Sequence, residues 1–209
     1  MNFLLTHTRE VATLAGEHLW LVGASMLIAI AIGLPLGILL TRKPRLKTLV
    51  FGSTNVIQTI PSLALFGLLL PVPWLGVRVE RLAITALALY ALLPIVRNTY
   101  IGITGISEAV RESAIAMGLT SRQLLWHVEF PLASPVILGG IRTATVITIG
   151  VATIAAAIGA GGLGEFIFRG IAMVDNDVIL AGAIPAALMA LIADLLLGGV
   201  EKLLARRQH

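Results

Sequence analysis

The residues that could carry chemistry are few, and they are not arranged like the site of an enzyme. The chain has no cysteine, and it has no Gly-x-x-x-x-Gly-Lys-Ser/Thr segment that could cradle the phosphates of ATP. Its four histidines lack the spacing of metal ligands: His7, His18, His127 and His209. Glu108 and Glu112 lie one helical turn apart, but the surrounding sequence offers no pocket for an acid–base pair. The sequence therefore predicts a protein without catalytic residues, metal or cofactor of its own.

The most informative polar segment is a predicted helical hairpin at residues 107–130. Ser107 is a typical N-cap for its first helix. The apolar residues of that helix recur at intervals of three and four: Val110, Ala114 and Met117. Gly118 suits the left-handed conformation that ends a helix, because it has no Cβ. Thr120 and Gln123 have the spacing of a capping box, which predicts the start of a second helix.

The outer side of this hairpin is suited to docking. Small side chains allow close approach of a partner, and we expect three of them to be exposed: Ser113, Ala114 and Ala116. Glu112 adds a fixed charge, and Pro131 either ends the second helix or opens the next apolar segment. An amphipathic helix resting on lipid headgroups is the alternative interpretation. The hairpin lacks the basic recognition face of a DNA-binding helix-turn-helix, so no nucleic-acid partner is expected.

These polar residues are set in a chain that is otherwise built for a membrane. It is 57% hydrophobic and only 12% charged, whereas soluble domains carry about 25% charged residues. Non-alternating apolar stretches of roughly 20 residues cross about 30 Å of hydrocarbon as helices. Within a single transmembrane domain, residues 1–209, five spans are predicted: 18–40, 48–70, 82–101, 132–158 and 178–199. The predicted fold class is an all-α membrane protein with five transmembrane helices.

Basic residues in the short loops predict the orientation of these spans, because loops rich in Lys and Arg stay in the cytoplasm. With five spans, one side of the membrane receives nine such residues: Arg42, Lys43, Arg45, Lys47, Arg111, Arg122, Lys202, Arg206 and Arg207. The other side receives four: Arg9, Arg78, Arg81 and Arg169. We therefore expect the hairpin and the C-terminus inside the cell and the N-terminus outside.

Two charged residues are predicted within the spans. Arg142 follows Pro131 by about 11 residues and Asp194 precedes Lys202 by eight, so both lie on the order of 12–16 Å from the inner edge. Ionisable groups in hydrocarbon usually face the bundle interior and pair. We therefore expect a structural ion pair between Arg142 and Asp194 that joins the fourth and fifth spans. The alternative is that each side chain snorkels or meets backbone carbonyls separately.

Uncharged polar residues mark the second and third spans: Asn55, Gln58, Thr59, Ser62, Tyr90 and Asn98. They are candidates for lining a translocation path, and interhelical hydrogen bonding is an equal alternative. A glycine cluster follows the fourth span: Gly159, Gly161, Gly162 and Gly164. Such a cluster does not hold a regular helix, so it predicts either a gate at the outer mouth or a plain external turn. Residues 165–177 are expected to be irregular.

The hairpin resembles the cytoplasmic EAA loop of ATP-binding-cassette importer permeases. That pattern is Glu-Ala-Ala, three residues, Gly, nine residues, an aliphatic residue, one residue and Leu-Pro. The matching residues are Glu112, Ala114, Gly118, Val128 and Pro131, and the mild departures are Ser113 for Ala, Val128 for Ile and Phe130 for Leu. The resemblance implies that Glu112, Ser113, Ala114, Gly118 and Pro131 belong to a coupling helix that docks into a separate ATPase subunit. ATP and Mg would then bind that partner.

The resemblance extends over most of residues 50–200. Six segments are similar to the osmoprotectant branch of these permeases: residues 58–62, 66–71, 90–98, 140–144, 152–155 and 158–164. That branch takes up glycine betaine, choline, carnitine and related quaternary amines. Methionine-type permeases share the glycine cluster and the five-span plan, and they are the alternative within the same class.

The resemblance implies a type I importer of the bacterial cytoplasmic (inner) membrane. Its expected partners are ATPase subunits, a second permease copy or paralogue, an extracytoplasmic binding protein and the lipid bilayer. Because the sequence ends at His209 without a fused binding domain, that binding protein is expected to be separate. Two other classes stay open: an ion-coupled secondary transporter, for which Asp194 is the one candidate carboxylate, and a passive pore or scaffold.

Overall fold

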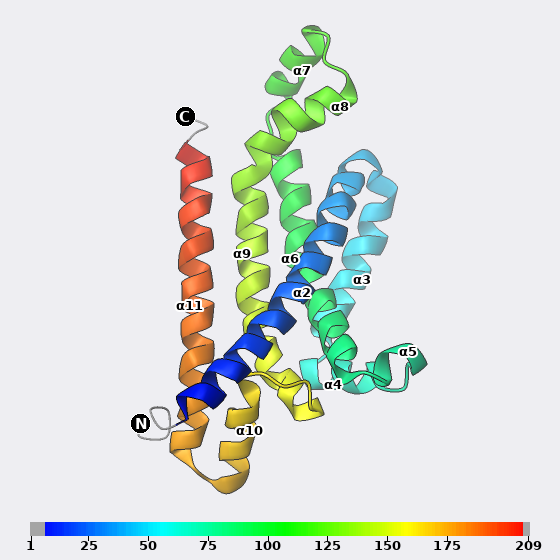
Figure 1. Ribbon diagram of the computed structural model, residues 1–209. Coiled ribbons are helices and arrows are strands. Elements are labelled where there is room, and N and C mark those ends of the chain that lie inside the picture. Colours follow the sequence, from blue (N-terminus) through cyan, green and yellow to red (C-terminus); the bar gives the residue numbers. More distant parts are fainter. Residues whose placement is uncertain (1–6, 207–209) are drawn as a thin grey trace.

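Long helices make up almost the whole molecule, and the computed structural model describes residues 7–206 (Figure 1). Four helical stretches in this range are long and apolar enough to cross a membrane. They are α2 (Thr8–Arg42), α6 (Val79–Thr104), α9 (Phe130–Ala155) with its flanking turns, and α11 (Asn176–Arg206). A bent pair of shorter helices supplies a fifth candidate span. Residues 7–206 contain no strand, so the predicted all-α class is confirmed.

The second span is broken, which corrects the continuous helix predicted for residues 48–70. After a 3₁₀ turn, η1 (Pro44–Leu46), the chain forms α3 (Lys47–Thr59) and α4 (Ser62–Leu69), and the pair is bent by 104°. The break lies at Ile60, whose ψ of 126° is extended. Pro61 causes it, because proline has no N–H to donate and pushes the preceding residue out of the helical region. As a result, α4 turns across the bundle instead of continuing through it (Figure 1).

Helix α6 lies at the centre of the bundle, and glycines allow its neighbours to approach closely. A Cβ at Gly37 of α2 would lie 2.6 Å from the Cβ of Thr99, and one at Gly140 of α9 would lie 2.5 Å from the Cβ of Asn98. Small residues at such crossings are typical of membrane helices, which associate through close packing. In the part of the helix before these contacts, α6 presents fully buried apolar side chains: Leu82, Leu87, Ala91 and Ile95.

Residues 165–177 are mostly helical, which corrects the irregular segment predicted there. A 3₁₀ turn, η3 (Ala156–Ile158), leads into three glycines with positive φ, Gly159, Gly161 and Gly162. Helix α10 (Gly164–Met173) then folds back against α11. Helix α10 is stabilised in this position by Phe166, which is fully buried in a small apolar cluster with Leu163 and residues of α11. This cluster depends on tertiary packing that the glycine-rich sequence does not indicate.

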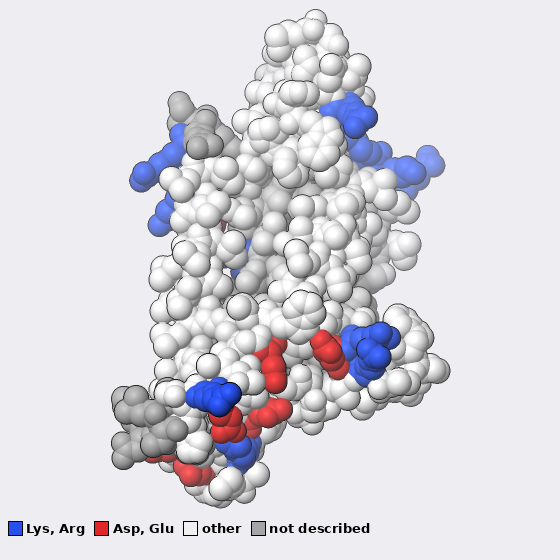
Figure 2. Space-filling view, viewed as in Figure 1, with Lys and Arg blue, Asp and Glu red and all other residues white. Residues whose placement is uncertain are grey.

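The molecule has two distinct ends. The turn from α2 to α3, the hairpin with α7 and α8, and the last turns of α11 lie together at one end (Figure 1). The start of α2, the short helix α5 (Pro73–Gly76) and α10 lie at the other. In Figure 2 the visible charged side chains gather near these two ends and leave a largely uncharged band between them. The loops predicted to share one side of the membrane therefore do share one end of the fold, except that Arg207 and His209 lie outside the described residues.

Candidate functional site

The first helix of the hairpin, α7 (Glu108–Ala116), begins and ends at the residues that the sequence indicated. The Ser107 side chain accepts a hydrogen bond from the Val110 N–H at 3.4 Å. At the other end Gly118 has a φ of +87°, and its N–H donates to the Ile115 carbonyl at 2.8 Å. The next N–H, of Leu119, reaches the Ala114 carbonyl at 3.2 Å. These bonds satisfy the last carbonyls of the helix and fix a tight turn.

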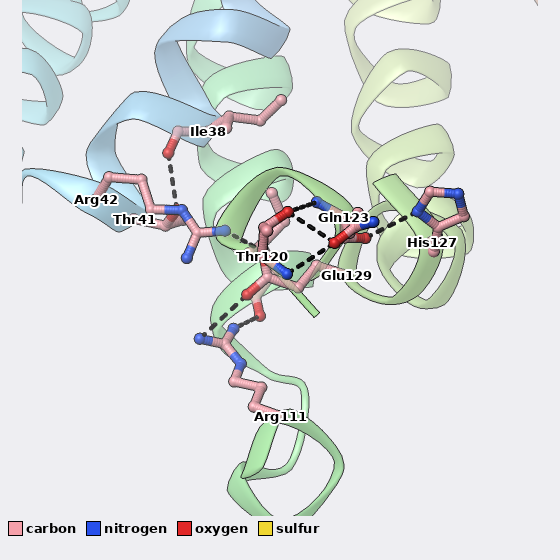
Figure 3. Close-up of polar contacts among 9 residues, drawn as sticks. Ile38, Thr41, Arg42, Arg111, Thr120, Gln123, His127 and Glu129 are labelled. Atoms are coloured by element: carbon pink, nitrogen blue, oxygen red, sulfur yellow. Dashed lines mark hydrogen bonds and ion pairs between the residues drawn. The ribbon is translucent and has the colours of Figure 1, made fainter. Parts of the chain in front are cut away.

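The second half of the hairpin is the start of a long helix. Helix α8 (Ser121–Leu124) opens with the predicted capping box: the Gln123 side chain accepts from the Thr120 N–H at 2.9 Å, and the Gln123 N–H donates to the Thr120 hydroxyl at 3.4 Å (Figure 3). It runs directly into a π-helical segment, η2 (Leu125–Glu129), and then into α9. Pro131 therefore opens the span and does not end the hairpin helix.

The outward surface of α7 is mixed, with charged, small and larger apolar side chains exposed. Glu112, Ser113 and Ala116 are exposed. Three larger apolar side chains are also exposed, at 41%, 58% and 75% of their area: Val110, Ile115 and Met117. Ala114 is buried, which corrects its predicted place on the exposed side. A shallow depression of about 330 Å³ lies beside it, lined by residues of α7 and by Val128. Exposed apolar side chains on a protruding helix are suited to contact with a protein partner.

The base of the hairpin contains a buried ionic cluster that sequence reasoning missed. Glu129 is fully buried and forms ion pairs with two arginines, Arg42 at the end of α2 and Arg111 in α7 (Figure 3). Arg111 also donates to the backbone carbonyl of Ile103, near the end of α6. One signal in the sequence could have indicated the cluster: Glu129 is a carboxylate at the very start of an apolar span, where an unpaired charge would be costly.

The polar residues of the second and third spans have mixed roles. The Gln58 side chain donates to the Tyr90 backbone carbonyl at 3.0 Å, and the Tyr90 hydroxyl donates to the Ile60 carbonyl at the break between α3 and α4. Asn98 donates to the Pro94 carbonyl within α6, at 2.9 Å. These three side chains therefore act as hydrogen-bonding partners of the backbone. The other candidates for lining a path are exposed or half-buried on α3 and α4: Asn55, Thr59 and Ser62.

Arg142 and Asp194 form the ion pair expected from their positions along the spans. The guanidinium reaches both carboxylate oxygens, with Nε 2.6 Å from Oδ1 and Nη2 2.7 Å from Oδ2. A third group that the sequence reasoning did not include, Glu201, lies 3.3 Å from Nη1 of the same arginine. The three side chains line an open groove of about 380 Å³ between α9 and α11.

The glycine cluster is held to the first span by a carboxylate. The Gly162 N–H donates to Oε2 of Glu17 at 3.1 Å, and a groove of about 430 Å³ beside it includes Trp20, Glu80 and Gly161. The Trp20 indole donates to Glu80 at 2.7 Å, so α2 and α6 meet at this end as well. Gly164 lies at the start of α10 and is buried. Among residues 7–206, no three His, Asp or Glu side chains are grouped as metal ligands.

The sequence is similar to characterised transport proteins. It is 50% identical over 190 residues to the glycine betaine/carnitine/choline transport system permease protein OpuCD of Bacillus subtilis, covering 90% of this chain and 82% of that one. It is 44% identical over 207 residues to the osmoprotectant import permease protein OsmW of Salmonella typhimurium, covering 98% and 96%. The carnitine transport permease protein OpuCB of Listeria monocytogenes is 45% identical, with 88% and 84% covered.

Solved structures share the fold. The MetNI methionine ABC transporter in an inward-facing conformation superposes with a TM-score of 0.83 at 22% identity, covering 93% of this chain and 95% of that one. An amino acid ABC transporter crystallised with histidines gives a TM-score of 0.73 at 18% identity, with 97% and 96% covered. The fold is therefore that of type I ABC importer permeases. The family described as binding-protein-dependent transport system inner membrane component matches residues 33–209, and the chain belongs to that family.

Proposed function

We propose that the chain is the permease subunit of an ATP-driven importer for quaternary-amine osmoprotectants of the glycine betaine, choline and carnitine type. The relatives that are 44–50% identical carry permease names for these compounds. Methionine-type transport is the alternative, and it has less support because the MetNI structure is only 22% identical. ATP hydrolysis belongs to a separate subunit, since this protein is a membrane component and not itself an enzyme.

The observation that carries the mechanism is the protruding hairpin. Helix α7 extends beyond the ends of the spans (Figure 1), and Glu112, Ser113 and several apolar side chains on it are exposed. The sharp turn at Gly118 connects α7 to α8, and α8 continues without a break into α9. The docking helix is therefore one tight turn away from a helix that enters the membrane.

The proposed assembly contains two permease chains, either identical or paralogous, two ATPase subunits and an extracytoplasmic substrate-binding protein. The hairpin and the C-terminus face the cytoplasm, and the N-terminus faces outward, in agreement with the basic residues at the hairpin end. Closure of the ATPases on ATP draws the two hairpins together and opens the path outward. Their reopening returns the path to the inward-facing state.

An ion-coupled secondary transporter is less well supported than an importer. Its coupling carboxylate would be Asp194, but this side chain is engaged in a two-point ion pair with Arg142. A passive pore or scaffold does not require a docking helix for an ATPase, so it does not explain the protruding α7. Co-purification separates these classes, because a stoichiometric ATPase subunit supports the importer and its absence favours the other two.

Uptake by the reconstituted complex tests the substrate. Proteoliposomes that hold the permease and its ATPase are given labelled glycine betaine, choline, carnitine and methionine, with ATP and with or without the binding protein. We expect ATP-dependent accumulation of one or more quaternary amines only when the binding protein is present. Accumulation of methionine alone would replace this substrate class with the alternative.

Gly118→Asp tests the coupling role of the hairpin. A side chain at a φ of +87° is strained, and an added charge projects into open space where the partner would dock. We expect insertion to be preserved and thermal stability to fall slightly because of this strain, whereas ATP hydrolysis no longer drives uptake. Normal uptake by this variant would remove the coupling assignment.

A further inference from the structure

One arginine makes the polar contacts between helix α7 and the rest of the molecule. Arg111 is the only side chain of α7 that makes a hydrogen bond or ion pair with another element, within the part of the chain that the structure describes. Its Nη1 lies 3.4 Å from Oε1 of Glu129, and the same guanidinium donates to the Ile103 carbonyl. Glu129 in turn is paired with Arg42, the last residue of α2. A single buried carboxylate thus connects the docking helix to the first span (Figure 3).

Without this connection, only the apolar packing around Ala114 and the two chain ends would hold α7. It is bounded by Gly105, which caps α6, and by the left-handed Gly118. Figure 1 shows α7 beyond the ends of the spans, with chain connections to the bundle only at its two ends. Force applied by a partner would then bend the chain at the two glycines and would not reach the spans.

The charge balance of the cluster favours keeping the three groups together. One fully buried carboxylate faces two guanidinium groups, whose side chains are 38% exposed for Arg42 and 26% exposed for Arg111. Leaving a buried charge without a partner is strongly unfavourable. Glu129 is therefore expected to keep both partners during a displacement, and the surplus positive charge of the two arginines is exposed in part to solvent.

The local backbone supports the same role. Glu129 is the last residue of the π-helical segment η2, which joins the hairpin to α9. A π turn holds one residue more than an α turn and so rotates the following helix by about 100°. Such segments inside α-helices are frequently found at functional sites. Here the π segment sets the register between the capping box at Thr120 and the carboxylate at Glu129.

We propose that Glu129 is a positioning residue: by binding Arg111 and Arg42 together, it makes α7, α2 and α9 move as one body. A displacement of the hairpin is then passed to two spans and is not absorbed at Gly105 and Gly118. This inference rests on the proposed function of the hairpin as the docking site of the ATPase. It adds that tight coupling needs the buried carboxylate as well as the docking surface.

The test compares Glu129→Gln with unmodified protein in the complete transporter, reconstituted with ATPase and binding protein. We expect the ATPase to stay bound and to hydrolyse ATP, while substrate transported per ATP falls roughly three- to tenfold. Hydrogen–deuterium exchange of residues 105–119 should become faster, with exchange in α11 unchanged. A role confined to overall stability would instead lower hydrolysis and uptake in proportion and speed exchange throughout.

Arg42→Gln supplies the second variant, because Arg42 is partly exposed and its loss is less damaging to folding than loss of Glu129. Arg42→Gln should also lower the amount of substrate transported per ATP. Glu129→Asp keeps the carboxylate, so its transport per ATP should lie between that of Glu129→Gln and that of the unmodified protein. The matched control is Arg45→Gln, an exposed cation of the same turn, which should behave as unmodified protein. Unchanged coupling and exchange in Arg42→Gln would overturn the inference. If Gly118→Asp uncouples transport and these variants do not, only this inference fails and the docking assignment stands.

Discussion

The ion cluster between α9 and α11 shows how single residues can join two spans. Arg142 binds Asp194 through two hydrogen bonds and reaches Glu201 at a longer distance. Gly198 makes room for the guanidinium, because a Cβ there would lie 3.0 Å from its central carbon. The cluster lines an open groove at membrane depth, so its charges satisfy one another where lipid would not.

A double-mutant cycle measures this pairing. Asp194→Asn should lower the thermal stability and the assembly yield of the permease, because Arg142 loses its two-point partner. The same change in an Arg142→Gln background should have a smaller effect, since the interaction is already absent. Glu201 remains as a partner of Arg142 in Asp194→Asn and limits the loss of stability. Adding Glu201→Gln to Asp194→Asn should therefore lower the thermal stability further. Purely additive losses would show that the two residues act independently.

At the residue scale, the sequence indicated positions whose role is local and missed those whose role depends on the fold. Ser107, Gly118 and the Thr120–Gln123 capping box were predicted because each acts within a few residues of its own position. Glu129 was missed because its partner Arg42 is 87 residues away and lies in a run of cations. The place of the Arg142–Asp194 pair was predicted because helical rise alone gives the depth of each residue.

Close packing of α2 against α6 depends on glycines at the crossing. An added methyl at Gly37 would come within 2.6 Å of the Thr99 Cβ, which forces the helices apart. We expect Gly37→Ala to destabilise the permease by about 1–3 kcal/mol, the usual cost of overpacking. Gly23→Ala is the control on the same helix, because nothing lies within 4 Å of the added Cβ. Thermal unfolding in detergent should therefore fall for the first variant and stay the same or rise for the second.

The break between α3 and α4 depends on a hydrogen bond from the central helix. The Tyr90 hydroxyl donates to the Ile60 carbonyl, which lies at the break between the two helices, just before Pro61. We expect Tyr90→Phe to destabilise the protein by about 1–3 kcal/mol, because a buried carbonyl is left unsatisfied. Tyr100→Phe is the matched control, since the Tyr100 ring contacts Phe51 and Lys47 and both contacts survive the change. Equal unfolding temperatures for the two variants would contradict this role of Tyr90.

The errors at the scale of elements have one physical origin. Hydropathy predicted residues 48–70 as one span that contains Pro61 and did not indicate a break, because proline is tolerated in many membrane helices. Pro35, Pro94, Pro135 and Pro185 do lie inside continuous helices. Whether a proline bends or breaks a helix therefore depends on tertiary contacts, here the hydrogen bond from Tyr90 to the Ile60 carbonyl at the break. Helix α10 was missed for the same reason, since contacts with α11 stabilise it.

The arrangement of the whole molecule followed from the order of apolar segments and polar loops. An odd number of spans places the N-terminal start of α2 and the C-terminal end of α11 at opposite ends, as the structure shows (Figure 1). Short loops leave few other ways to pack successive antiparallel helices. Contacts with partner subunits could not be predicted in this way. The exposed apolar side chains of α11 are suited equally to contact with lipid and to contact with a second permease chain.

The orientation of the fold in the membrane gives a prediction at this scale. The chain has no cysteine, so a single introduced cysteine reports on one position without further changes. Val77, between α5 and α6, is 81% exposed and lies at the end predicted to face outward. Ser121, at the start of α8, is exposed at the hairpin end. In intact cells, a membrane-impermeant maleimide should label Val77→Cys and leave Ser121→Cys unlabelled.

Disruption of the membrane should then expose Ser121→Cys to the same reagent. This second step is needed because a cysteine that is shielded by protein would also stay unlabelled in intact cells. The physical reason for the expected result is the asymmetry of cations: the loops at the hairpin end carry most of the Lys and Arg residues, and such loops are retained in the cytoplasm. Labelling of Ser121→Cys before disruption would place the hairpin outside, where no ATPase could reach it, and would overturn the coupling mechanism together with the orientation.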